Sequence, residues 1–510
     1  MATKKPTSFF TFPSAYTVIL LVLLLVMILT YFMPSGKYAS LQYNTQSNNF
    51  TITSPTGRES TAPGTQATLK KYHVNTSLAK FKDGSVYKPV AIPNTYQHLK
   101  KANTGLFGAV KQFLNAPIQG LAETIDIITF VLILGGIVGV VNKTGAFAAG
   151  MAALSKKLKG REAWLIVIVT SLIALGGTTF GLAEETIAFY PILVPIFMAA
   201  GYDALVAIAA IYLGSSIGTM ASTVNPFSVV IASNTAGISF TEGMGLRLVM
   251  LVIGTAMCIF YTIRYAEKVK KDPEKSLIYS QKAELEAHFL GDQENNVVPK
   301  FDFRKKLMLI IFAAGFVIMV FGVKEWGWLF NEISALFLAI TFILAFISGL
   351  SEKDFVGEFV AGASDLLGVA LVIALARGVT IIMEQAQISD TLLFWLSNGV
   401  SHMSGVIFST VMFFVFILLG FFIPSSSGLA VLSMPVMAPL ADVVGVHRDV
   451  IISAYNWGQG IMSFITPTGL VLASLAMVHV TFDKWLKFVL PLMLAIGLLA
   501  MILLGISVYL

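Results

Sequence analysis

Long apolar segments separated by short polar ones run along almost the whole chain. Four of the longest cover residues 15–33, 125–141, 244–263 and 488–510. Each approaches the roughly 20 helical residues that cross the hydrocarbon core of a bilayer. The pattern predicts an all-α polytopic membrane protein with nine crossings.

Two further apolar runs end early, at glycines and hydroxyl residues. Residues 164–175 would make about 12 residues, or roughly 18 Å, of helix before Gly176-Gly177-Thr178-Thr179. Residues 407–419 likewise precede Gly420 and the segment 423–428, which reads IPSSSG. Because both runs are too short to span a bilayer, we expect two re-entrant hairpins.

Two more breaks, at residues 214–226 and 456–469, predict two broken transmembrane helices. They contain Ser222-Thr223-Val224-Asn225-Pro226 and the segment 463–468, SFITPT. A proline removes a helix donor and frees a carbonyl. Non-helical backbone with unpaired N–H and C=O groups is tolerated inside a bilayer only where it is buried in protein or lines a water-filled cavity. The breaks therefore predict a binding site, although kinks whose hydroxyls satisfy the backbone remain an alternative.

The candidate site residues lie at or near these four breaks, with one arginine elsewhere. The substrate-binding candidates are Gly177, Thr178, Thr179, Glu184, Glu185, Asn225, Arg377, Ser425, Ser426, Ser427, Asn456 and Thr466. Weaker candidates for ion binding are Ser222, Thr223, Ser463 and Thr468, because free carbonyls and hydroxyls suit Na⁺.

An internal repeat relates the two halves of the chain. Gly120, Glu123 and Gly136 match Gly362, Asp365 and Gly378 at an offset of 242 residues. Later pairs are Pro191, Pro195, Gly201 and Gly214 with Pro435, Pro439, Gly445 and Gly458 at 244, then Ser222, Pro226, Ala232 and Ser233 with Ser463, Pro467, Ala473 and Ser474 at 241. Weakly similar halves are typical of secondary transporters.

Loop charges give an orientation and a domain division. Lys4, Lys5, the lysines of 143–161, the run 264–306, Lys484 and Lys487 mark one side as cytoplasmic. We predict a first inverted repeat at 1–264 with an irregular or weakly folded external loop at 34–108, a cytoplasmic linker at 265–306, an inverting helix at 307–323, and a second inverted repeat at 324–510. The N-terminus is then cytoplasmic and the C-terminus external.

Composition supports a membrane protein and excludes several other classes. Hydrophobic residues make up 56% of the chain and charged residues 12%, and the net charge of +6 comes from scattered clusters rather than a basic domain. Nucleic acid is therefore not an expected partner. The single cysteine, Cys258, cannot form an internal disulfide, and the six histidines form no metal cluster or proton relay in the sequence. We expect no metal and no cofactor, with coupling to Na⁺ or to protons.

Glu184 and Glu185 are the sharpest polar feature, because an acidic side chain within a membrane is costly and functional by default. A water-exposed tip, or one protonated carboxyl, is the alternative. Two carboxylates would attract an ammonium or guanidinium group, which favours a cationic or zwitterionic substrate. Arg377, inside the apolar segment 369–383, needs a partner such as a substrate carboxylate, Asp365 or Glu384.

Other functional classes fit less well. Ser425-Ser426-Ser427-Gly428 could suggest an intramembrane hydrolase, but no histidine lies in an apolar helix to act as its base. The sequence has no filter-like repeat, so a channel is not expected. It also has no phosphate-binding loop, so an ATP-driven pump is not expected. We therefore expect a transporter and not an enzyme.

Four segments resemble the YfcC/DcuC-type carriers of the ion transporter superfamily. They are GGTTFGLAEETIAFYPILVP at 176–195, ASTVNPF at 221–227, ALARG at 374–378 and IPSSSGLA at 423–430. The resemblance implies a secondary transporter of the bacterial inner membrane, commonly a homodimer, whose two hairpins and two broken helices enclose the site and move as an elevator.

The substrate that the resemblance implies depends on the branch of the family. The tip Gly181-Leu182-Ala183-Glu184-Glu185 is similar to that of an arginine/ornithine antiporter branch, although Ala183 replaces the second glycine of its Gly-x-Gly-Glu-Glu pattern. Other relatives carry C4-dicarboxylates such as succinate. Basic amino acid exchange is the preferred prediction, and dicarboxylate transport is the alternative.

Overall fold

The structure is a computed structural model of the whole chain. It describes the chain except for residues 1–14, 75, 83–85, 87–88, 102–104, 148, 151–152, 154–160, 291–299, 327, 329 and 399–402. Lys4, Lys5, Lys156, Lys157 and Lys159, on which the predicted orientation partly depends, lie outside the described residues.

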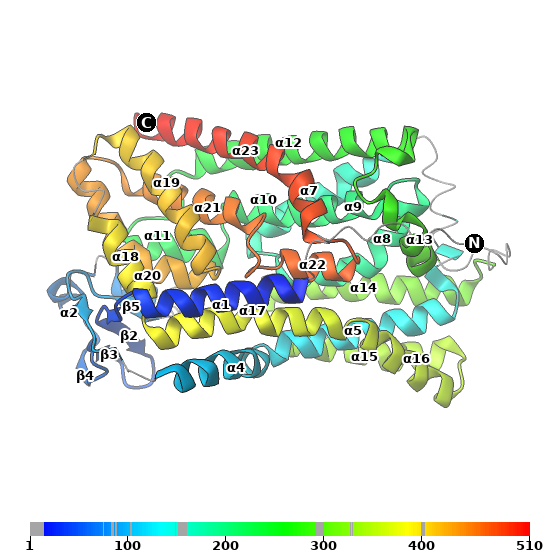
Figure 1. Cartoon of the computed structure of the whole chain (residues 1–510), viewed down its shortest axis with the longest axis horizontal. Coiled ribbons are helices and arrows are strands. Elements are labelled where there is room, and N and C mark those ends of the chain that lie inside the picture. The colour runs from blue at the N-terminus through cyan, green and yellow to red at the C-terminus, as the bar shows by residue number, and fades with distance from the viewer. Residues whose placement is uncertain are drawn as a thin grey trace.

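Helices make up most of the molecule, as the apolar segments predict (Figure 1). Among the described residues, seven helices are long and apolar enough to cross a membrane. The long single helices are α1 (Ala15–Phe32), α12 (Met244–Lys271), α14 (Phe303–Trp326), α15 (Phe330–Ser348) and α23 (Phe482–Ser507). Their outward faces are apolar; Phe346, for example, is 90% exposed, as suits contact with lipid.

Two long, interrupted helices pack against each other along their length. One consists of α4 (Gly105–Glu123) and α5 (Ile125–Lys143), and the other of α16 (Glu352–Asp365) and α17 (Leu367–Ala386). α4 packs on α17, and α5 packs on α16. The sequence prediction missed α4, whose start it placed in the external loop.

Small residues let these two helices approach closely, because glycine has no side chain at the crossing. A Cβ on Gly120 would lie 2.1 Å from the Ala374 carbonyl oxygen, and one on Gly362 would lie 2.3 Å from that of Gly135. Gly120 and Gly362 are the first pair of the predicted repeat. The two crossings thus use equivalent positions, while the inverted orientation of the halves stays a prediction.

The remaining helices form two hairpins and two broken helices. The first hairpin consists of α7 (Ala163–Phe180), η1 (Glu184–Phe189) and α8 (Tyr190–Ala199), and the second of α19 (Gly405–Phe422) and α20 (Ser426–Val444). The first broken helix consists of α9 (Ala204–Ile208), η2 (Ala209–Leu213), α10 (Gly214–Met220), η3 (Pro226–Val230) and α11 (Ile231–Ala236), and the second of α21 (Arg448–Ser463) and α22 (Val471–Met477). α19 and α20 are themselves among the seven helices long enough to cross a membrane, so the number of nine crossings stays a prediction.

The prediction that segment 34–108 is irregular or weakly folded is wrong, while its external location stays a prediction. The segment folds into an antiparallel sheet of order β4-β3-β2-β5 and a two-stranded ribbon of β1 and β6. Its elements are β1 (Gly36–Lys37), β2 (Ser40–Asn44), β3 (Asn49–Thr53), β4 (Glu59–Pro63), α2 (Gln66–Lys71), α3 (Leu78–Lys82), β5 (Val90–Ala91) and β6 (Gln97–His98). Leu41, Phe50, Leu69 and Val90 are fully buried in a separate apolar core. This core supplies the order that the polar composition concealed.

The small β domain lies at one end of the helices, which we call the sheet end (Figure 1). The C-terminus lies at the same end, as does α18 (Ser389–Asn398). The linker helix α13 (Lys282–Leu290), preceded by the short turns η4 (Pro273–Lys275) and η5 (Tyr279–Gln281), lies at the opposite end, the linker end. The linker therefore lies at the end opposite to the small β domain and the C-terminus, while the side of the membrane that each end faces stays a prediction.

Candidate functional site

The tip of the first hairpin begins where α7 ends. Gly181 adopts a left-handed conformation (φ 79°), and its N–H donates to the carbonyl of Gly176, so the helix stops there. Glu184 and Glu185 then open the 3-10 turn η1, and both are half-buried. The backbone N–H of Ala183 donates to Glu185 Oε2 at 3.2 Å.

The carboxyl groups of Glu184 and Glu185 have no basic partner in the part of the chain that the structure describes. No Lys or Arg among the described residues forms a salt bridge with either side chain. Their acidic neighbours are each other and Asp126 at the start of α5. We call this tip the acidic pole; a bound cation would balance the negative charge of its carboxylates.

The end of α7 is fastened to the first helix break. The Thr178 hydroxyl donates to the Ala221 carbonyl at 2.7 Å and lies 3.1 Å from the Thr223 hydroxyl. The N–H of Thr223 donates back to Thr178 Oγ1 at 3.0 Å. Asn225 donates from Nδ2 to the Gly177 carbonyl at 3.2 Å and caps η3 by accepting from the N–H of Phe227. Five predicted residues, Gly177, Thr178, Ser222, Thr223 and Asn225, thus meet in one buried network.

The second hairpin tip is fastened to the second broken helix in a similar way. Ser425 caps α20 by accepting from the N–H of Gly428 at 3.2 Å. The Ser426 hydroxyl donates to Gln459 Oε1 at 3.2 Å, and Tyr455 donates to the Ser426 carbonyl at 2.7 Å. This tip carries no acidic residue between Pro424 and Gly428, in contrast to the first tip with Glu184 and Glu185.

Hydroxyl groups also fasten the second break. Thr466 and Thr468 lie 2.9 Å apart through their hydroxyl oxygens, and Thr468 donates to the Phe421 carbonyl at 3.3 Å. Both threonines are buried. The predicted alternative, in which hydroxyls satisfy the backbone of a kink, therefore describes part of what these residues do.

Ser215 and Gln459 are two site residues that the sequence prediction missed. The Ser215 hydroxyl donates to the Leu182 carbonyl at 2.7 Å, and Gln459 Nε2 donates to the Pro424 carbonyl at 3.0 Å. Each bond holds a hairpin tip to the broken helix of the same half. Gln459 lies 244 residues after Ser215 and Pro424 lies 242 after Leu182, so the repeat offsets were the signal that could have found them.

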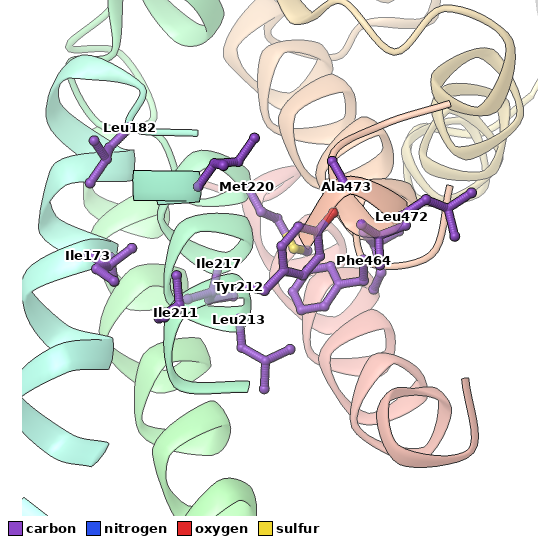
Figure 2. Close-up of a cluster of buried hydrophobic side chains, with 14 of the residues drawn as sticks. Ile173, Leu182, Ile211, Tyr212, Leu213, Ile217, Met220, Phe464, Leu472 and Ala473 are labelled. Atoms are coloured by element: carbon purple, nitrogen blue, oxygen red, sulfur yellow. The ribbon is translucent and has the colours of Figure 1, made fainter. Parts of the chain in front are cut away.

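The two halves meet where their broken helices cross (Figure 2). Tyr212 and Met220 of the first half face Phe464, Leu472 and Ala473 of the second. The Tyr212 hydroxyl donates to the Ser463 carbonyl at 2.7 Å. Asn456 accepts a hydrogen bond from Ser228, another residue that the sequence prediction missed. These contacts join the two networks into one buried unit.

The predicted positions of the four breaks need correction. α7 continues through Gly176-Gly177-Thr178-Thr179 to Phe180, so it has 18 residues, about 27 Å, rather than about 12. α19 likewise continues through Gly420 to Phe422. The other breaks are shorter than predicted, at 221–225 and 464–470. Close helix packing explains the glycines, because a Cβ on Gly177 would lie 3.0 Å from the Ser215 carbonyl oxygen.

The hydroxyl groups of two further predicted residues bond within their own helices. The Thr179 hydroxyl bonds back to the carbonyl of Leu175, and the Ser463 hydroxyl bonds back to that of Gly460, each within its own helix. Ser427 is buried in the first turn of α20. Their roles in binding stay predictions.

Arg377 pairs with another long helix rather than with the hairpins. Its Nε and NH2 each lie 2.7 Å from Glu123 Oε2 on α4, and NH1 lies 3.6 Å from Glu384. The sequence predicted that Arg377 needs a partner, and Glu384, on the same helix, was one of those named. Glu123 was not, because nothing local in the sequence places it beside a residue 254 positions away.

Two buried donors remain available in α21. Asn456 Nδ2 and Trp457 Nε1 have no hydrogen-bond acceptor among the described residues. Asn456 is 1% exposed and Trp457 is fully buried. Donors of this kind suit a carboxylate or another acceptor-rich group. Within the described part of the chain, no three His, Cys, Asp or Glu side chains are grouped to hold a metal ion.

Comparison with known proteins identifies the family. The family model described as "DcuC: C4-dicarboxylate anaerobic carrier" matches residues 12–509. The chain belongs to this family. It is therefore a membrane transporter, and the resemblance found in the sequence is confirmed.

Two relatives extend this result. An uncharacterized protein of Haemophilus influenzae is 48% identical over 100% of this chain and 99% of its own length. The putative basic amino acid antiporter YfcC of Escherichia coli is 32% identical over 73% of this chain and 77% of its own.

Two solved transporter structures align over nearly the full length. The YdaH transporter of Alcanivorax borkumensis has a TM-score of 0.39 and 14% identity, covering 97% of this chain and 98% of its own. MtrF of Neisseria gonorrhoeae, described as an antimetabolite efflux pump, has a TM-score of 0.36 and 15% identity, covering 98% and 96%.

Proposed function

We propose that this DcuC-family carrier exchanges basic amino acids of the arginine/ornithine type across the bacterial inner membrane. The observation that carries the proposal is the acidic pole formed by Glu184 and Glu185, which has no basic partner among the described residues. A guanidinium or ammonium group would supply the missing charge, since opposite charges attract strongly away from bulk water. The printed name of YfcC, a putative basic amino acid antiporter, supports the same substrate class.

The neutral second tip suits the other end of an amino acid. α20 begins at Ser426, so its first N–H groups point toward the tip, where the helix dipole favours negative charge. The free donors of Asn456 and Trp457 lie on the neighbouring helix α21. An amino acid whose carboxylate binds these donors and whose cationic group binds the acidic pole would use both halves.

Residues of the same site would bind the coupling ion, whether it is a proton or Na⁺. A proton could be carried by Glu184 or Glu185, whereas Na⁺ would use the oxygen atoms of Ser222 and Thr223, or of Ser463 and Thr468. The homodimer and elevator-like movement implied by the family resemblance remain part of this proposal.

A C4-dicarboxylate is the second candidate, because the matching family model bears that description. The two free donors, Asn456 Nδ2 and Trp457 Nε1, would donate hydrogen bonds to a carboxylate of this substrate too. The acidic pole argues against it, since two carboxylates repel a dianion. The alternative keeps the same fold and changes only the substrate.

Transport into liposomes tests the proposal. Purified protein is reconstituted into liposomes loaded with ornithine, succinate or buffer, and uptake of labelled arginine and succinate is measured with Na⁺ or pH gradients. We expect arginine uptake only with ornithine inside. Accumulation of succinate alone would replace our proposal with the second candidate.

Substitutions then assign the acidic pole. Glu184→Gln and Glu185→Gln should each reduce arginine uptake by at least about tenfold, the effect of losing about 1.4 kcal/mol of interaction. Glu352→Gln, which removes an exposed carboxylate at the start of α16, should have no effect and serves as the control. Unchanged uptake in both tip variants would remove these residues from the site.

A further inference from the structure

A separate cavity lies at the sheet end, away from the four breaks. It has a volume of about 830 Å³ and opens between the end of α1, the start of α4 and the end of α17, beside the small β domain. Figure 1 shows these three helices running side by side to that end. None of the hairpin or break residues lines it, so the proposed transport function does not account for it.

The charges of the cavity are all positive. Lys100, Lys101 and Lys111 line it, and no acidic residue does so within the described part of the chain. Lys100 and Lys111 are exposed. The amide side chains of Gln112, Asn115 and Gln119 supply further polar groups on the α4 wall. The lining thus suits an anion that also carries hydroxyl or ester oxygens.

The helix ends around the cavity favour the same ligand. The carbonyls at the end of α1 and α17 would repel an anion, but they already accept hydrogen bonds. Lys101 donates to the Thr30 carbonyl, Ser35 donates to the Ala386 carbonyl at 2.8 Å, and the N–H of Gly36 donates to the Gln387 carbonyl at 3.0 Å. The start of α4, at Gly105, faces the cavity with the positive end of its dipole.

Exposed apolar side chains of α1 and α4 flank the cavity, as suits helix faces that contact lipid. Phe107 of α4 is 83% exposed and Phe32 of α1 is 79% exposed, and Leu114 and Ile118 continue the apolar face of α4. A soluble anion would gain nothing from this surface, whereas acyl chains would lie along it. Lysines close to a membrane surface attract anionic lipid headgroups, by about 1 kcal/mol for each lysine.

We propose that this cavity binds the headgroup of phosphatidylglycerol. Lys100, Lys111 and the first turn of α4 hold the phosphate, and the amides of Gln112, Asn115 and Gln119 bind the glycerol hydroxyls. Lys101 holds the end of α1 and so positions the site. The acyl chains extend along the exposed faces of α1 and α4.

Native mass spectrometry of the full-length protein tests this proposal. The detergent-purified carrier is titrated with phosphatidylglycerol or phosphatidylethanolamine of the same acyl chains, and bound lipid is counted. We expect phosphatidylglycerol to be preferred, and Lys100→Gln/Lys111→Gln to weaken its binding by about fivefold for each lysine removed. The control, Lys70→Gln/Lys71→Gln, removes two exposed lysines of the β domain outside the cavity and should keep the preference.

Three outcomes would overturn the proposal. The wild type could show no preference for phosphatidylglycerol, or the cavity variant could keep the wild-type preference. Glycerol phosphate could also displace the lipid as effectively as short-chain phosphatidylglycerol does, which would mean that the site takes a soluble anion. If the double variant does not fold, Lys111→Gln alone should still show the fivefold loss.

Discussion

The side-chain amide of Gln459 donates a 3.0 Å hydrogen bond to the carbonyl oxygen of Pro424, and so ties the second hairpin tip to its broken helix. Ser215 makes the corresponding bond to Leu182 in the first half, at 2.7 Å. Each tie holds a residue that lies just outside a helix, because Leu182 precedes η1 and Pro424 precedes α20. The two bonds give the first prediction.

Gln459→Leu and Ser215→Ala should each lower the stability of the purified protein by about 1 kcal/mol, the net value of one hydrogen bond. Uptake should fall as well, because the tips lose their fixed position. Thr129→Val is the control, since its exposed hydroxyl bonds to the Ile125 carbonyl of its own helix and it is not a candidate site residue. Thermal unfolding in detergent measures the effect, and equal midpoints for all three variants would contradict it.

Gly362→Ala should destabilise the packing of α16 on α5 by about 1–3 kcal/mol, the range for overpacking. Its Cβ would lie 2.3 Å from the Gly135 carbonyl oxygen and 2.9 Å from the Gly139 backbone. Gly357→Ala, on the same helix with open space around it, should be neutral or stabilising. Yield and thermal unfolding of the two variants provide the measurement. Similar behaviour of both would show that the crossing is looser than described.

Arg377→Glu should destabilise the protein, because it places a third carboxyl beside Glu123 and Glu384. Glu123→Arg/Arg377→Glu restores the pair between α4 and α17, and we expect both stability and uptake to return. A stable double variant that does not transport would instead assign Arg377 to substrate binding, as the sequence predicted.

The linker helix α13 should dock less tightly as the pH falls. Burial, and then the neighbouring His479 ring at 4.6 Å, lower the pKa of His288, while Asp365 and Glu284 act in the opposite direction. Because its pKa is lower when docked than when released, docking is strongest above the ordinary value of about 6.5 and weakens as the pH falls through it.

Hydrogen exchange of residues 282–290 measures this effect, after correction for the intrinsic pH dependence of exchange. We expect less protection at pH 5.5 than at pH 7.5, and His288→Gln should remove most of the difference. The same protection at both pH values in the wild type would refute the prediction.

The sequence by itself determined the features that depend on neighbouring residues. Apolar length predicted the helices, proline and hydroxyl residues predicted that helices break near 226 and 467, and the repeat offsets placed these breaks in corresponding parts of two halves. The acidic pair at 184–185 and the neutral tip at 425–427 were also visible. These inferences hold because crossing a bilayer constrains each segment locally, through its length and its backbone hydrogen bonds.

Only the tertiary structure decided the features that depend on distant partners. Strand β2 pairs with both β3 and β5, so Leu41 lies opposite Ile52 and Val90, and a polar segment becomes a folded domain. Packing against α10 accommodates Gly177 within a continuous α7, and Glu123 reaches Arg377 from another helix. Such contacts join residues that are far apart along the chain, and each residue's own sequence context carries no record of its partner.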